Sequence, residues 1–303
     1  MIVTAMSTRR TFLRNTAALL PATLLAARGG WASALGRDRI GGDAQSRTEH
    51  IPLGVQLFTV RHQAEQDLPA VLGQIHEIGY QEVEAYGGLY THSAASLRHM
   101  ILEAGLRVPS GHFDYRTLDT QFNYAQELGL SWIVCPAITP SLWGSLDGFR
   151  TAAKQFNAWG QRARQMGMRF AFHNHDYEFR PFNGKTGYEV LVDDTDPQLV
   201  FFEIDCYWAV QAGHDPLRMM ERMGPRVKML HLKDRAPGFP ISYEMNQAAA
   251  HFVPVGSGTI DWKAILAEGK RIGVEHYFVE QDETAGPPIN ALRESYRYLR
   301  SIT

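Results

Sequence analysis

The sequence has little of several features that would assign a protein to a specialised class. Only two cysteines, Cys135 and Cys206, occur in 303 residues, so no disulfide framework is expected to carry the fold. The 30 lysines and arginines are balanced by 32 acidic residues, and a balanced chain lacks the basic footprint of nucleic-acid binding. No apolar run is long enough for a mature segment to cross a bilayer. We therefore expect neither a nucleic-acid partner nor a membrane partner.

A glycine-rich dinucleotide fingerprint is also missing at the position where it would be informative. The first apolar run continues as GVQLFTVRHQ, and a doubly wound nucleotide-binding fold thereby loses its main support. The two cysteines lie in apolar, strand-like runs, and we expect both to be buried and unpaired.

The N-terminal segment has the pattern of an export signal. Paired arginines, Arg9 and Arg10, precede a short apolar run that closes on Ala32-Ser33-Ala34. A basic start, an apolar centre and a small-x-small cleavage site are typical of a signal peptide, and the twin arginine indicates the Tat route. We expect residues 1–45 to be a Tat signal peptide with a linker, and the mature protein, residues 46–303, to be periplasmic.

The mature chain alternates between short apolar runs and longer helical segments. Eight runs are predicted to be strands, at residues 51–60, 80–86, 106–113, 131–137, 168–175, 198–205, 226–234 and 275–282. Helical patterns separate them, and several end in glycine, the usual residue of a left-handed helix cap. Eight strand–helix units with continuous apolar strands predict an α/β fold, a single-domain (β/α)₈ TIM barrel.

Polar residues stand where the apolar runs stop. The active site of such a barrel lies at the carboxyl ends of its strands, and strand residues two apart point to the same side. Because the outer side must pack against helices, we expect these residues to face the barrel interior: Gln56, Glu84, His112, His173 with His175, Glu203 with Asp205, His231 with Lys233, and Glu280 with Asp282.

Converging carboxylates and imidazoles predict a divalent cation. Burying unpaired charges together is costly, and a cation removes that cost while it creates a Lewis acid. A mixed His/Asp/Glu set suits Mn²⁺, Zn²⁺, Fe²⁺ or Co²⁺ and does not indicate a site selective for metals that prefer thiolate. Each residue also has a simpler interpretation, such as Asp205 as a helix cap, and the argument depends on their coincidence at successive strand ends.

Several stretches resemble the xylose isomerase-like TIM-barrel superfamily, in particular its sugar phosphate isomerase/epimerase branch. They are GVQLFTVR, FHNHDYEF, FFEIDCYW, MLHLKD, VPVGSGTIDW and YFVEQDE, and the resemblance extends over about residues 50–300. It also reaches inosose dehydratases and, more distantly, endonuclease IV, whose additional zinc ligands this chain does not reproduce. The resemblance implies one divalent metal, with Mn²⁺ favoured and Zn²⁺, Co²⁺, Fe²⁺ or Mg²⁺ as alternatives.

The same resemblance implies the metal ligands. Three of the family's four ligands carry over by position onto Asp205, His231 and Glu280. At the end of the fifth strand many relatives have glutamate, whereas this chain reads His173-Asn174-His175. His173, His175 and Glu178 are the three candidates there; we expect His173 to bind the metal, with His175 and Glu178 contacting substrate.

The expected activity is that of a sugar isomerase or epimerase that abstracts an α-proton from a keto sugar and forms an enediolate. Glu280 is the expected base, with Lys233 and His175 as further catalytic residues. The expected substrate contacts are Gln56, Glu84, His112, Glu178 and Trp208, and Phe113 is expected to add an apolar wall. Elimination from a periplasmic 3-keto-glycoside is the alternative, and a non-catalytic sugar-binding protein the third. The oligomeric state is left open.

Overall fold

The computed structural model describes residues 51–245 and 247–303. The predicted signal segment, residues 1–45, therefore lies outside the described residues. Among the described residues, no helix combines the length and the apolar character that a membrane crossing requires.

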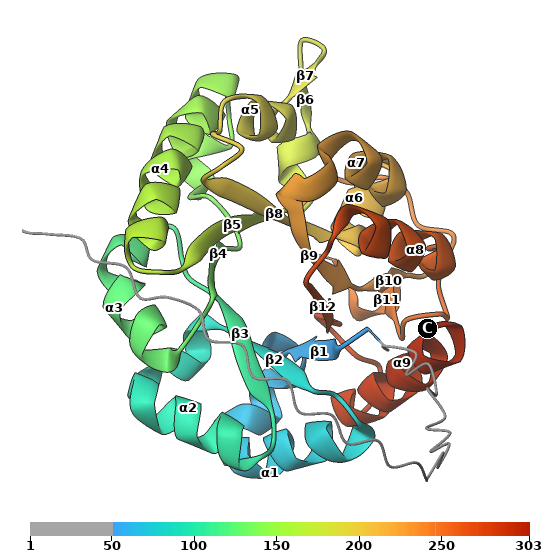
Figure 1. Cartoon of the computed structure of the whole chain (residues 1–303). Helices are drawn as coiled ribbons and strands as arrows, with labels where there is room; N and C mark the ends of the chain where they lie inside the picture. The colour runs from blue at the N-terminus through green and yellow to red at the C-terminus, as the bar shows by residue number, and fades with distance from the viewer. Residues whose placement is uncertain (1–50, 246) are drawn as a thin grey trace, which may run out of the picture. The chain divides into compact units, whose positions relative to one another are not determined.

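Eight parallel strands close into a barrel, which confirms the predicted fold (Figure 1). In barrel order they are β1 (Leu53–Gln56), β12 (His276–Val279), β9 (Val227–Leu232), β8 (Val200–Asp205), β5 (Arg169–His173), β4 (Trp132–Cys135), β3 (Arg107–His112) and β2 (Glu82–Ala85). The first and last strands pair directly, with Leu53 opposite Tyr277 and Val55 opposite Val279.

Helices surround the barrel (Figure 1). They are α1 (Arg61–Ile78), α2 (Ala94–Glu103), α3 (Leu118–Leu128), α4 (Leu146–Gln165), α5 (Gly187–Asp193), α6 (Cys206–Gln211), α7 (Pro216–Met223), α8 (Trp262–Ile272) and α9 (Pro288–Ile302). Helix α1 ends at Gly79, whose φ of 115° is left-handed, as the predicted glycine caps require. The larger apolar core lies between the strands and these helices and includes both cysteines, which are buried and unpaired as expected.

The first strand is shorter than predicted. We expected a strand over residues 51–60, but β1 ends at Gln56 and a 3₁₀ turn, Leu57–Val60, leads straight into α1. The Gln56 side chain accepts a hydrogen bond from the backbone N–H of Phe58 at 3.1 Å. This side-chain cap turns the chain out of the sheet, an effect that the apolar pattern of the segment does not contain.

The barrel interior is layered. Its lower layer is apolar and contains Trp132, Val134, Ala171, Met229 and Phe278. Arg169 closes this end, because its guanidinium lies 3.8 Å above the Trp132 ring and pairs with both carboxylate oxygens of Glu275. The buried polar side chains of the candidate site lie on the other side of this apolar layer, toward the carboxyl ends of the strands.

The chain after β9 is fastened by one carboxylate. Asp234 begins the short strand β10 (Asp234–Arg235), which pairs with β11 (Phe252–Val253). Its two oxygens accept six hydrogen bonds, from Arg235, Gly256, Gly258, Thr259 and Ile260 backbone N–H groups and from the Trp262 indole. A Cβ at Gly258 would collide with this carboxylate, which explains the second glycine in VPVGSGTIDW. A second small hairpin, β6 (Pro181–Phe182) with β7 (Lys185–Thr186), follows β5.

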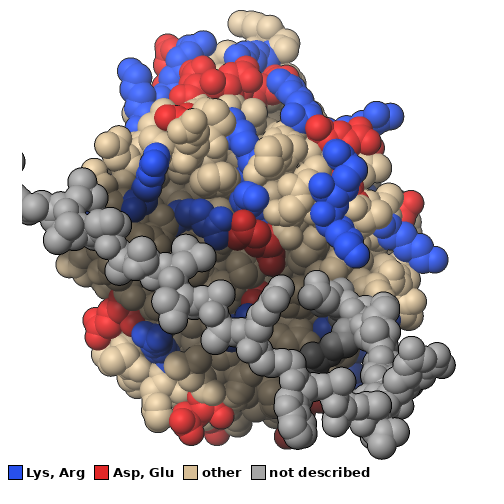
Figure 2. Space-filling view, viewed as in Figure 1, with Lys and Arg blue, Asp and Glu red and all other residues tan. Residues whose placement is uncertain are grey.

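Charges of both signs are mixed on the surface. Figure 2 shows lysine and arginine side chains beside acidic ones over the visible part of one face. This mixture agrees with the formal net charge of −2.

Candidate active site

A cavity of about 620 Å³ opens above the polar upper layer of the barrel. Side chains from several strand ends line its floor, namely His112, His173, Lys233 and Glu280. Its walls include His175, Trp208, Phe58, Tyr86, Phe252 and Asp282. Parallel strands bring their carboxyl ends to one rim, and for this reason residues so distant in sequence meet here.

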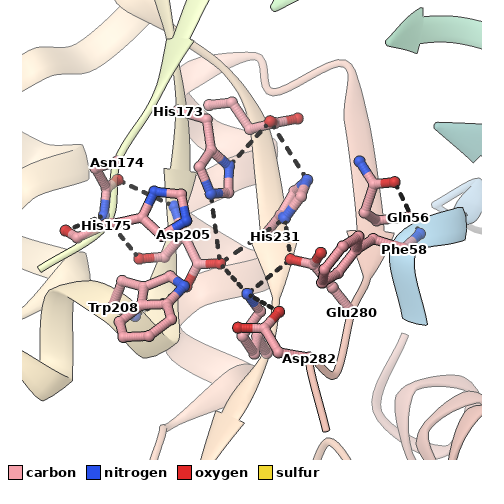
Figure 3. Close-up of polar contacts among 12 residues, drawn as sticks. Gln56, Phe58, His173, Asn174, His175, Asp205, Trp208, His231, Glu280 and Asp282 are labelled. Atoms are coloured by element: carbon pink, nitrogen blue, oxygen red, sulfur yellow. Dashed lines mark hydrogen bonds and ion pairs between the residues drawn. The ribbon is translucent and has the colours of Figure 1, made fainter. Parts of the chain in front are cut away.

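Three predicted ligands lie together at the base of this cavity (Figure 3): Glu280 lines it, and Asp205 and His231 are buried beside Glu280. His231 Nδ1 lies 2.8 Å from Glu280 Oε2 and 3.8 Å from Asp205 Oδ2. His231 and Asp205 are fully buried, and Glu280 is nearly so. The three side chains place their ligand atoms close enough to hold one ion. We call Asp205, His231 and Glu280 the outer group.

Lys233 is the cation of the outer group. Its Nζ lies 3.1 Å from Asp205 Oδ2, 2.7 Å from Glu280 Oε2 and 2.8 Å from Asp282 Oδ1. Three carboxylates therefore surround one ammonium, which leaves an excess of negative charge that a divalent cation would neutralise.

The pKa values reflect this excess. Burial alone would raise the pKa of Glu280, but Lys233 and His231 lower it overall, well below its usual range. Burial raises the pKa of Asp282 to about 6 against the attraction of Lys233, and the charge of Glu280 adds to the rise. The pKa of Asp205 is also raised, chiefly by burial. Of the three carboxylates, Glu280 is thus the one whose pKa the neighbouring cations lower below its usual value.

A second polar group lies beneath the first. His231 Nε2 is 2.7 Å from Glu84 Oε2 and 3.3 Å from Glu203 Oε2, and His112 Nε2 is 3.2 Å and 2.8 Å from the same two atoms. His173 Nδ1 is 3.1 Å from Glu203 Oε2. We call Glu84, Glu203 and His112 the inner group.

Hydrogen bonds and opposite charges hold the inner carboxylates ionised. Burial would raise the pKa of both glutamates, but His112 and His231 lower the pKa of Glu84 well below its usual range, and the histidines bring that of Glu203 to about 2. Although burial opposes it, Glu84 and Glu203 raise the pKa of His112 to about 9. Gln56 Nε2 and Ser110 Oγ also donate to Glu84.

The three candidates at the end of β5 are oriented differently. His173 Nε2 lies 3.9 Å from Asp205 Oδ2 and faces the outer group. The His175 ring lies on the cavity wall, 5.3 Å from the Trp208 ring between centroids, and burial lowers its pKa to about 3. Glu178 accepts the backbone N–H of His175 and is fully buried. Of the three, His173 is the one that reaches the outer group.

The expected substrate contacts divide into two sets. His112 and Trp208 line the cavity. Gln56, Glu84 and Glu178 are fully buried and do not belong to its lining. Phe113 is likewise buried and stacks on Tyr90, with 4.6 Å between ring centroids. We therefore regard Gln56, Glu84 and Glu178 as support for the site, and Phe113 is part of the core instead of a cavity wall.

Sequence reasoning missed several cavity residues. Phe58 lies in the unpredicted 3₁₀ turn, where its ring is 37% exposed. Tyr86 follows β2, and Phe252 lies in β11, which we did not predict. Both Phe58 and Tyr86 lie within the last three residues of predicted strands, 51–60 and 80–86, so an aromatic residue near the carboxyl end of a predicted strand was the available signal.

The donor atoms fit a divalent cation. Glu203 Oε1 is buried and accepts no hydrogen bond from the described residues, and Asp205 Oδ2 is buried with the Lys233 ammonium, at 3.1 Å, beside it. A buried carboxylate oxygen with no hydrogen-bond donor is unusual unless an ion or water completes it. The outer group offers imidazole nitrogen and carboxylate oxygen, which borderline divalent metals accept. His173 Nε2 would complete four ligands.

Comparison with known proteins places these features in a family. A family model described as xylose isomerase-like TIM barrel matches residues 72–302. Inosose dehydratase of Geobacillus kaustophilus is 23% identical over 274 residues, which cover 76% of this chain and 85% of that enzyme. Inosose dehydratase of Clostridium botulinum is 28% identical over 160 residues; that match spans 49% of this chain and only about half (52%) of the clostridial enzyme.

A solved structure shares the fold of this chain. The crystal structure of a sugar phosphate isomerase/epimerase from Parabacteroides distasonis superposes with a TM-score of 0.72 at 25% identity. The match covers 84% of this chain and 98% of that protein.

Proposed function

The chain belongs to the xylose isomerase-like TIM-barrel family, and from this premise we propose that it is a divalent-metal-dependent enzyme acting on a small keto sugar or keto polyol. The first step is removal of a proton from the carbon next to the substrate carbonyl, which gives an enediolate. One observation carries this proposal: Asp205 and His231 are buried next to Glu280, which lines the cavity together with the Lys233 ammonium.

The metal position lies among His173, Asp205, His231 and Glu280. A divalent cation bound there supplies a Lewis acid that polarises the carbonyl and stabilises the negative charge of the enediolate. Mn²⁺ is the ion we propose first, with Zn²⁺, Co²⁺, Fe²⁺ and Mg²⁺ as the ions to compare. The mixed nitrogen and oxygen donors support a transition metal over Mg²⁺.

The chain's own residues then move the proton. Glu280 is ionised because Lys233 and His231 hold its pKa low, and its carboxylate takes the α-proton. As the C–H electron pair moves toward the carbonyl oxygen, the Lys233 ammonium, which is paired with Asp205, Glu280 and Asp282, provides positive charge beside the developing negative charge. His175 is uncharged at neutral pH because burial lowers its pKa, so its ring orients substrate hydroxyls beside the Trp208 wall.

We propose elimination as the outcome of the enediolate. Its electron pair re-forms a double bond while the bond to a β-oxygen breaks, and the departing oxygen takes up a proton. Two dehydratase relatives support this outcome. The cavity, at about 620 Å³, lies within the ~300–1,000 Å³ of ligand pockets and has room for a sugar ring with a substituent.

Isomerisation or epimerisation is the second candidate. The same enediolate can be reprotonated at the neighbouring carbon or on its other face, without loss of a group. The structural likeness to the sugar phosphate isomerase/epimerase of Parabacteroides distasonis supports it.

We further propose that the protein is exported by the Tat route, on the basis of Arg9, Arg10 and the Ala32-Ser33-Ala34 site. Phosphorylated sugars are mainly cytoplasmic, so export favours a neutral keto sugar or keto glycoside as substrate. Replacement of both arginines by lysine should retain the protein in the cytoplasm, as cell fractionation would show.

Solvent isotope exchange tests the proposed chemistry. Mn²⁺-loaded protein is incubated in D₂O with neutral keto sugars and 3-keto glycosides, and NMR and product mass are followed. Exchange of the α-proton is expected in either outcome; elimination splits or dehydrates the molecule, whereas isomerisation adds only deuterium. Binding of these ligands without any exchange would instead identify a non-catalytic binding protein.

Metal analysis tests the site itself. Asp205→Ala and His231→Ala are each expected to lose the bound ion in elemental analysis of dialysed protein. Full metal content in both variants would show that the ion is bound elsewhere.

A further inference from the structure

Two histidines, His231 and His173, lie between the carboxylates of the outer group and those of the inner group. His231 turns Nδ1 toward Glu280, at 2.8 Å, and Nε2 toward Glu84, at 2.7 Å. His173 turns Nε2 toward Asp205 Oδ2, at 3.9 Å, and Nδ1 toward Glu203 Oε2, at 3.1 Å. Figure 3 shows the His231 ring beside Glu280 and the His173 ring turned toward Asp205. Each ring therefore turns one nitrogen toward a carboxylate of the outer group and the other nitrogen toward a carboxylate of the inner group.

A neutral imidazole carries one proton, on one nitrogen only. A nitrogen that binds a metal must have a free lone pair, so the proton has to be on the second nitrogen of the ring. The hydrogen-bond partner of that second nitrogen decides whether the proton stays there. A carboxylate beside the distant nitrogen keeps the proton there and raises the basicity of the metal-binding nitrogen.

The inner carboxylates are built as fixed acceptors. Glu84 and Glu203 are buried and do not line the cavity. Glu84 accepts hydrogen bonds from Gln56 Nε2, at 2.8 Å, and from Ser110 Oγ. His112 Nε2 lies 2.8 Å from Glu203 Oε2. These neighbours fix both carboxylates in place, although neither can reach a substrate.

We propose that Glu84 and Glu203 are positioning residues that set the tautomers of the two histidine ligands. Glu84 holds the proton of His231 on Nε2, and Glu203 holds the proton of His173 on Nδ1. The lone pairs of His231 Nδ1 and His173 Nε2 then point to the outer group. This inference rests on the metal site proposed above, and it gives Glu84 and Glu203 a role that does not require contact with substrate.

One rival arrangement uses the same atoms. His112, His173, Glu203 and His231 also lie close enough to hold an ion in the inner group. Such an ion would take the inner nitrogens of His173 and His231, and a second ion in the outer group would then require both rings to lose their last proton. The two positions are therefore alternatives, which an experiment can separate.

The test compares Glu84→Gln and Glu203→Gln with Glu82→Gln. Glu82 is a matched control: it lies on the same strand, is buried, and its carboxylate is 2.8 Å from His276 Nδ1, away from the cavity. Zn²⁺ affinity is measured by chelator competition on folded protein, together with metal content per chain. Glu84→Gln and Glu203→Gln should each bind Zn²⁺ about 10–100-fold more weakly, and Glu82→Gln should match wild type.

A second measurement needs no variant of the inner group. Long-range ¹H–¹⁵N spectra of Zn²⁺-loaded wild type, with imidazole ¹⁵N labels, report the protonated nitrogen of each ring. The expected result is one Zn²⁺ per chain, His231 protonated on Nε2 and His173 on Nδ1. Opposite tautomers, two ions per chain, or unchanged affinity in both variants would overturn the inference while the metal site stands. A wild-type chain that binds no divalent ion would overturn the proposed function as well.

Discussion

Replacement of Asp234 by asparagine tests how the chain after β9 is fastened to the segment of residues 256–262. Each oxygen of Asp234 accepts three of the six hydrogen bonds described above. Asparagine keeps one oxygen and puts an NH₂ group against the three donors of the other. The variant therefore loses three acceptor contacts and adds two donors that have no acceptor nearby.

The magnitude follows from that geometry. A buried donor left without an acceptor costs about 1–3 kcal/mol. Since the loop, at the Gly256 and Gly258 amides, is only partly buried, water and relaxation relieve part of this cost, and we expect the free energy of unfolding to fall by about 3–5 kcal/mol. A domain has about 5–15 kcal/mol in total, so the loss is large.

The assay is urea unfolding followed by circular dichroism. Asp261→Asn in the same loop is the control, because Asp261 caps α8 through the Ala264 N–H and asparagine caps a helix as well as aspartate does. Its stability should change by less than about 0.5 kcal/mol. A loss of under about 1 kcal/mol in Asp234→Asn, or equal losses in the two variants, would refute the view that Asp234 fastens this loop.

Three further predictions concern single side chains. Glu280→Gln should slow α-proton exchange in D₂O at least ~100-fold, while Glu82→Gln exchanges at the wild-type rate; equal rates would remove Glu280 as the base. Burial, with a contribution from Asp176, raises the pKa of Glu178 to about 8 from 4.5, so the folded chain keeps a proton that the unfolded chain releases. Stability should therefore fall as pH rises from about 4.5 to 8, and Glu178→Gln should flatten the profile by up to roughly 1.4 kcal/mol per pH unit; an unchanged slope would contradict the buried acid. Arg169→Met removes a half-exposed ion pair and a cation–π contact from the opposite end of the barrel, and should cost about 1–2 kcal/mol of stability with Zn²⁺ affinity unchanged; a weakened affinity would show that this end is coupled to the site.

The sequence allowed the barrel and the side on which each polar residue lies to be predicted. Alternation along a strand fixes which side chains face inward, so Asp205, His231 and Glu280 could be expected to meet. Alternation does not fix height along the barrel axis, which depends on the stagger between neighbouring strands. For that reason Glu84 was expected to contact substrate, whereas it is fully buried and does not line the cavity.

Two further details could not be predicted for different reasons. Whether Glu178 turns inward or bonds the His175 N–H is decided by the turn after β5, and apolar periodicity carries no information on a turn. The aromatic residues Phe58 and Phe252 reach the cavity from segments whose structure the pattern misassigned or left out.

The closed order of the strands has a consequence for folding. Glu84 and His231, which bond in the site, are 147 residues apart, and the Thr59–Gln281 bond joins residues 222 apart. Contacts of such separation form only after most of the loop-closure entropy has been lost. The candidate metal position therefore comes into existence when β12 docks between β9 and β1, as the last strand of the chain. Glu280, which follows β12, joins His173, Asp205 and His231 only when this strand is paired. Uptake of a metal by all four ligands would therefore report closure of the barrel, and the compartment in which the chain folds would decide which metal it receives.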